Sequence, residues 1–119
     1  MRGVGLRQVD ALWAGARSVE VCSRWPRDGE RSVMVGGVVE IAELAGLLET
    51  DLTADPFTCM CWGDVTFTVR GERGRVLGVL THHLDGGLDW EEWGGEVPLL
   101  RLRELSQWLA EHGVVSHNP

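Results

Sequence analysis

The sequence contains no lysine and no tyrosine, and isoleucine occurs only once, at Ile41. The codons for these residues are AT-rich, so their scarcity indicates a high-GC bacterial genome of the actinobacterial kind. All 11 basic residues are arginines, and the 18 acidic residues leave a formal net charge of −7. Proteins that bind nucleic acids or anionic membranes do so with clustered cations. The charge balance therefore argues against nucleic-acid and membrane partners.

Long apolar runs are also absent. No run reaches the length of a membrane span, and Gln8 and Asp10 interrupt the apolar residues near the N-terminus, so no signal-peptide core is predicted. We therefore expect a cytoplasmic protein, whose three cysteines are thiols or ligands rather than disulfides. The phosphate-binding loop, the dinucleotide fingerprint, the Gly-x-Ser-x-Gly elbow and the His-Glu-x-x-His motif are missing as well. These absences favour a protein that is not an enzyme, without excluding catalysis.

The pattern of apolar residues predicts one α+β domain over residues 1–119, with a loose tail at 116–119. The fold we expect is an antiparallel sheet, made of an N-terminal hairpin and a three-stranded meander, with helices packed on one face. The expected helices cover residues 6–16, a segment ending near 50–51, and residues 99–112. The first expected strand begins at Ser18, and the others cover residues 32–35, 57–69, 76–84 and 88–93. Gly113 should cap the last helix, with Val114 folding back onto Leu109.

The helical and strand periodicities together predict the core. Apolar residues at spacings of three and four mark the inner face of each helix, and every second residue marks the inner face of each strand. The residues that should be almost fully buried are Leu44, Leu48, Val65, Phe67, Leu80, Leu105 and Leu109.

Turn geometry predicts the registers of the meander. A tight turn after the longest strand pairs Phe67 with Gly78. A two-residue turn at Asp85-Gly86 pairs His82 with Asp89. A slip of one residue would exchange the two faces of a strand.

In this register one face of the meander gathers two thiols, an imidazole and a carboxylate. Such groups are zinc ligands, and a Cys-x-Cys pattern places both sulfur atoms on one side of a strand. The candidate metal ligands are Cys59, Cys61, His82 and Asp89. The alternative is that the two cysteines are small core residues, as buried cysteines usually are.

The opposite face gathers aromatic and polar side chains that suit a recognition surface, because aromatic residues are enriched at interface centres. The candidate binding residues are Trp62, Asp64, Thr81, His83 and Trp90. The alternative is that the two tryptophans pack together, or beneath the N-terminal helix, as part of the core.

Several motifs in the second half of the chain occur together. They are Cys59-Met60-Cys61-Trp62-Gly63-Asp64, His82-His83, Trp90-x-x-Trp93 and Trp108-Leu109-x-x-His112-Gly113. This set resembles small uncharacterised actinobacterial proteins with a Cys-x-Cys-x-Gly-Asp hairpin, a His-His pair and a C-terminal Trp-Leu helix. The resemblance implies a folded unit and brings no activity with it.

The leading hypothesis is a small non-catalytic binding or regulatory protein without a cofactor. It would engage a protein partner, as immunity proteins and accessory factors do, or a second copy of itself in a homodimer. The alternative hypothesis is a metal- or thiol-dependent site, with zinc held by the four candidate ligands.

Overall fold

The computed structural model describes residues 10–25, 29–51, 53, 64–83, 87–90, 93 and 95–114. Within these residues, three α-helices and six strands make up an α+β fold with an antiparallel sheet, as predicted. In chain order the elements are α1 (Asp10–Ala14), β1 (Ser18–Trp25), β2 (Gly29–Val35), α2 (Val38–Leu47), β3 (Asp64–Arg70), the 3-10 turn η1 (Glu72–Gly74), β4 (Val76–His83), β5 (Leu88–Trp90), β6 (Gly95–Val97) and α3 (Leu102–Glu111).

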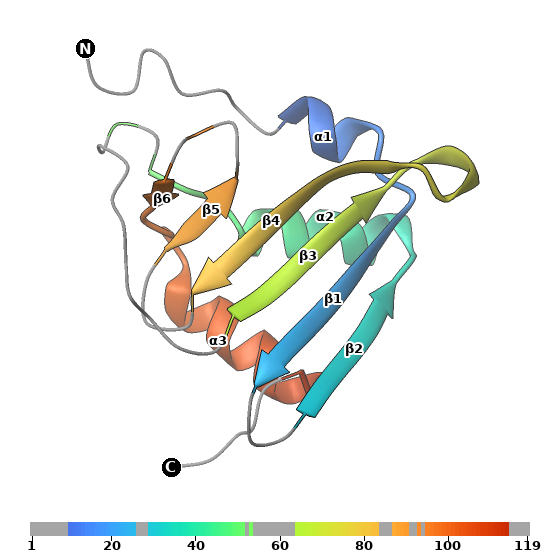
Figure 1. The fold of residues 1–119 in the computed structure, drawn as a ribbon. Coiled ribbons are helices and arrows are strands. Elements are labelled where there is room, and N and C mark those ends of the chain that lie inside the picture. Colours follow the sequence, from blue (N-terminus) through green and yellow to red (C-terminus); the bar gives the residue numbers. More distant parts are fainter. Residues whose placement is uncertain are drawn as a thin grey trace.

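All six strands belong to one sheet, in the order β2-β1-β3-β4-β5-β6 (Figure 1). Each strand is antiparallel to its neighbours, and β1 joins the N-terminal hairpin to the meander by pairing with β3. The strand predicted over residues 88–93 is wrong in extent. β5 ends at Trp90, and a separate edge strand, β6, follows it.

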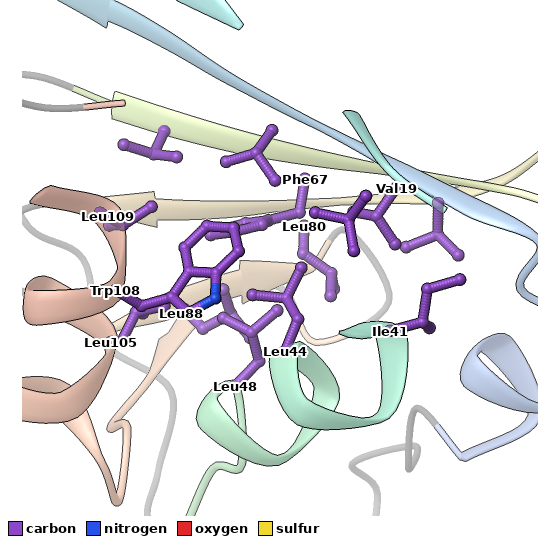
Figure 2. Close-up of a cluster of buried hydrophobic side chains, with 14 of the residues drawn as sticks. Val19, Ile41, Leu44, Leu48, Phe67, Leu80, Leu88, Leu105, Trp108 and Leu109 are labelled. Atoms are coloured by element: carbon purple, nitrogen blue, oxygen red, sulfur yellow. The ribbon is translucent and has the colours of Figure 1, made fainter. Parts of the chain in front are cut away.

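The described helices lie on one face of the sheet. Figure 1 shows α2 and α3 behind the strands, and Figure 2 shows their side chains meeting those of the strands. Alternate strand residues point into this covered face and are fully buried, among them Val21, Val65 and Phe67. All seven residues predicted for the core are at most 1% exposed, which confirms the prediction.

Helix α1 enters the core through a residue that the pattern did not single out. The expected helix over 6–16 has Trp13 and Ala16 on its apolar stripe, yet both are half-buried and Leu12 is the buried residue. Leu12 lies over Gly78 of β4. A β-carbon added at Gly78 would be 2.9 Å from the Cδ1 atom of Leu12. The absence of a side chain at Gly78 therefore lets α1 approach the sheet. Residues 6–9 of the expected helix lie outside the described residues.

Helices α2 and α3 are both shorter than predicted, for one shared reason. The segments after α2 and before α3 pair with each other: Thr50 forms a bridge with Leu99, and the Asp51 amide donates to the Pro98 carbonyl at 2.9 Å. Residues engaged in this pairing cannot also take part in helical hydrogen bonds. α2 therefore ends at Leu47, and α3 begins only at Leu102.

The predicted C-cap of α3 is confirmed. Gly113 has a φ of 73°, a left-handed conformation that glycine adopts without strain. The amide of Val114 donates to the Leu109 carbonyl at 2.9 Å, and the Val114 side chain is fully buried. This is the hydrophobic contact that such caps make. No helix in the described part of the chain is long and apolar enough to cross a membrane.

Candidate functional site

The β3–β4 hairpin keeps the predicted faces but not the predicted partners. Phe67 pairs with Leu80 rather than with Gly78, because the connection contains the 3-10 turn η1 and β4 is displaced by two residues. A shift of two residues leaves each side chain on the same face of the sheet. Asp64 consequently pairs with His83, whereas the expected pairing was with Thr81.

The β4–β5 register is displaced by one residue, and this exchanges the faces of β5. His82 pairs with Leu88, and Asp89 pairs with Thr81. The expected two-residue turn is wrong: the His83 amide donates to the Gly87 carbonyl at 3.2 Å, which closes a wider connection. Of that connection, residues 84–86 lie outside the described residues.

The predicted metal set is therefore not assembled as expected. His82 is fully buried on the helix-covered face, and Asp89 lies on the opposite face. Cys59 and Cys61 lie outside the described residues. In the ranges that the structure does describe, no group of three His, Cys, Asp or Glu side chains is arranged to hold a metal ion.

The predicted recognition surface is divided in the same way. Thr81 and His83 lie on the uncovered face, whereas Trp90 pairs with Leu80 and packs against the core. Trp90 meets Trp93 edge to face, with ring centroids 5.6 Å apart. Trp62 lies outside the described residues. Trp90 therefore packs against the core instead of lying on the uncovered face, and Thr81 and His83 remain candidates for recognition.

A polar network joins the two faces where β4, β5 and β6 meet. The imidazole Nδ1 of His82 lies 3.2 Å from the Gly87 carbonyl oxygen, and the Gly87 amide donates to the carboxylate of Glu96 at 2.9 Å. Glu96 is 2% exposed. A side chain at residue 87 would collide with the Val97 backbone, so glycine is required there. These contacts satisfy buried polar groups and fix the end of the sheet.

No described helix lies on the other side of the sheet, which faces the viewer in Figure 1. On this side, two rows of side chains cross the strands, and we call these two rows the uncovered face. The first row runs across β2, β1, β3 and β4 and consists of Met34, Glu20, Thr68 and Val79. The second row extends to β5 and consists of Ser32, Cys22, Thr66, Thr81 and Asp89.

The two rows of the uncovered face hold two carboxylates, each next to a basic side chain. Glu20 in the first row forms an ion pair with Arg70, at 3.1 Å, and each side chain is about one-third exposed. Asp89 in the second row lies 4.0 Å from His83. Hydroxyl groups and short side chains occupy most of the remaining positions. An open hollow at the β5 end of the face is lined in part by Val79, Thr81 and Asp89.

The two apolar ends of the first row are residues that the sequence patterns did not identify. Met34 is 59% exposed and Val79 is 43% exposed. The only sequence signal is that each is an apolar residue at an outward position of its strand. Isolated apolar residues are common on protein surfaces. Met34 and Val79 differ from such isolated residues because they lie at the two ends of one row across the sheet.

We compared the chain with protein-family models, with curated proteins and with solved structures, and none of them matches it.

Proposed function

We propose that this chain is a non-catalytic protein-binding module whose uncovered face packs against the same face of a second copy. The observation that supports the proposal is the order of side chains in the first row. The row has an exposed apolar side chain at each end, Met34 on β2 and Val79 on β4.

This order is self-complementary. A twofold axis parallel to the strands, between β1 and β3, places β2 of one copy over β4 of the other. Met34 then meets Val79 of the second copy, twice in the dimer, and Glu20 meets Thr68 of the second copy. In the second row, Cys22 meets Thr66 by the same operation. No two side chains of like charge in the two rows face each other.

The size of the face predicts a weak dimer. Four strands about 4.8 Å apart, with seven residues rising about 3.3 Å each, span roughly 19 by 23 Å. Each copy would then bury roughly 440 Å², below the range of about 600–1,000 Å² per partner that stable complexes bury. The net charge of −7 on each copy opposes association. We therefore expect reversible dimers with a micromolar or higher Kd, strengthened by added salt.

A charge-swap experiment tests the pairing by sedimentation equilibrium. Met34→Lys and Val79→Glu should each weaken self-association by tenfold or more, because each buries a charge against an apolar side chain. An equimolar mixture should associate more tightly than either variant alone, since one of its two contacts then joins an ammonium to a carboxylate.

Val38→Lys is the matched control. Val38 is 86% exposed at the start of α2, away from the uncovered face, so its variant should associate like the wild type. A wild-type protein that remains monomeric at all concentrations refutes the proposal. So does a mixture that associates no better than its two components.

A further inference from the structure

A second surface lies at the opposite end of β3 and β4 from His83, beside the turn that joins these strands. An open hollow of about 650 Å³ forms between this turn and the end of α1. Three arginines line it: Arg17 from the α1–β1 connection, and Arg73 and Arg75 from the turn. The Arg17 amide donates to the Arg70 carbonyl at 2.7 Å, which ties the two segments together.

The charge of this hollow is opposite to that of the chain. Three of its lining residues are arginines and one, Glu72, is acidic, whereas the whole chain carries a net charge of −7. Glu72 lies 3.4 Å from Arg17, in an ion pair whose side chains are 79% and 68% exposed, respectively. The interaction energy of such an exposed ion pair is small. The hollow therefore keeps a positive potential that suits an anion.

Arg73 occupies a strained backbone position. Its φ of 60° and ψ of 24° lie in the left-handed region, and it is the only residue other than glycine with a positive φ in the described part of the chain. A left-handed conformation is unfavourable for a residue with a β-carbon, and such strain is concentrated at ligand sites. Glycine or asparagine would relieve it, yet the position carries a guanidinium.

The rest of the lining is uncharged, and we call it the floor of the hollow. It consists of Ala14, Gly15, Gly71 and Leu77. A β-carbon at either glycine would lie 3.2 Å from a methyl group of Leu77, so both glycines allow close packing around this side chain. The hollow thus places an uncharged floor beside three cationic groups.

We propose that this hollow binds a small phosphorylated ligand with at least two phosphate groups, whose uncharged part lies on Leu77. Guanidinium groups bind phosphate oxygens in a bidentate geometry, and three of them match the charge of a di- or triphosphate. The volume is within the range of about 300–1,000 Å³ that small-molecule sites occupy. The net charge of −7 on the chain disfavours an extended polyanion, which would reach beyond the hollow, so a small ligand fits better.

Isothermal titration calorimetry with pyrophosphate, tripolyphosphate and ATP tests this proposal and identifies the part of the ligand that matters. All three probes should bind, and ATP should bind more tightly than tripolyphosphate because its nucleoside can lie on Leu77. Equal affinities for ATP and tripolyphosphate would overturn the role of the floor. No binding of any probe would overturn the site.

Two variants separate a site from general charge attraction. Arg73→Asn should lower the affinity for tripolyphosphate about tenfold or more, and it should not unfold the protein because asparagine tolerates a left-handed backbone. Arg103→Gln, which removes an exposed arginine from α3, should leave the affinity within about twofold. Equal losses in the two variants would show non-specific attraction. Binding of an oligoglutamate peptide, without binding of tripolyphosphate, would instead assign the hollow to an acidic protein segment.

Discussion

The two faces of the sheet carry different chemistry on the same strands. In β3, Val65, Phe67 and Val69 are fully buried against the helices, whereas Thr66 and Thr68 between them lie on the uncovered face. The covered face is filled with branched and aromatic side chains. The uncovered face carries hydroxyl groups, one ion pair and two exposed apolar residues. Substitutions on the first face should therefore affect folding, and under the proposed function those on the second should affect association.

The largest difference is expected between two adjacent residues of β3. Phe67→Ala should lower the free energy of unfolding by about 3–5 kcal/mol, because it leaves a cavity in the core. Thr68→Ala should change it by less than about 0.5 kcal/mol, as is usual for surface positions. Urea denaturation measures both. Similar losses for the two variants would mean that the uncovered face is buried by some other part of the protein.

A smaller effect is expected where α1 meets the covered face. Gly78→Ala should cost about 1–3 kcal/mol, because the new methyl group would lie 2.9 Å from a methyl group of Leu12. In a Leu12→Ala background the same substitution should cost much less. A double-mutant cycle from denaturation curves gives the coupling. Additive costs would contradict the packing of Leu12 over Gly78.

On the uncovered face, the ion pair between Glu20 and Arg70 should contribute little to stability. Both side chains are about one-third exposed, so a double-mutant cycle with Glu20→Gln and Arg70→Gln should give a coupling below about 1 kcal/mol. The coupling should fall further as sodium chloride is added. A larger coupling that resists salt would place this pair in a buried environment.

The smallest effect concerns Asp51, which lies on neither face. Hydrogen bonds from the Thr53 hydroxyl and amide lower the pKa of its carboxyl. A lowered folded-state pKa stabilises the protein above the unfolded-state pKa, and that contribution is lost as the pH falls through the folded-state value. Thr53→Val removes the hydroxyl donor and should raise the pKa of Asp51 toward its usual value. An NMR titration that finds no change would contradict the hydrogen bond.

Periodicity predicted the covered face well and the uncovered face poorly. The burial of a strand residue follows from the alternation of apolar and polar residues along the strand. Val65 and Phe67 could therefore be assigned to the core from the sequence alone. The C-cap at Gly113 was predictable because a glycine followed by an apolar residue is a local signal. The pairing of β5 depends instead on the width of one connection, and an error of one residue placed Trp90 and Asp89 on the wrong faces.

The apolar ends of the first row lie beyond sequence reasoning for another reason. Met34 and Val79 belong to strands that are not neighbours in the sheet, and only the insertion of β1 and β3 between them places both in one row. No local pattern encodes the order of strands in a sheet. The arginine-lined hollow is similar, because Arg17 joins the turn only through the pairing of β1 with β3.

The central claim is that the uncovered face pairs with itself, and an intermolecular NOE tests it most directly. Within one copy, Met34 and Val79 are three strand spacings apart, about 14 Å, too far for an NOE between their methyl groups. In a concentrated mixture of labelled and unlabelled protein, isotope-filtered spectra should show an NOE between the Met34 and Val79 methyl groups. Core methyl groups such as those of Val65 should show none. An absent NOE in a sample that sedimentation proves to be dimeric, or a sample that remains monomeric, would contradict the account.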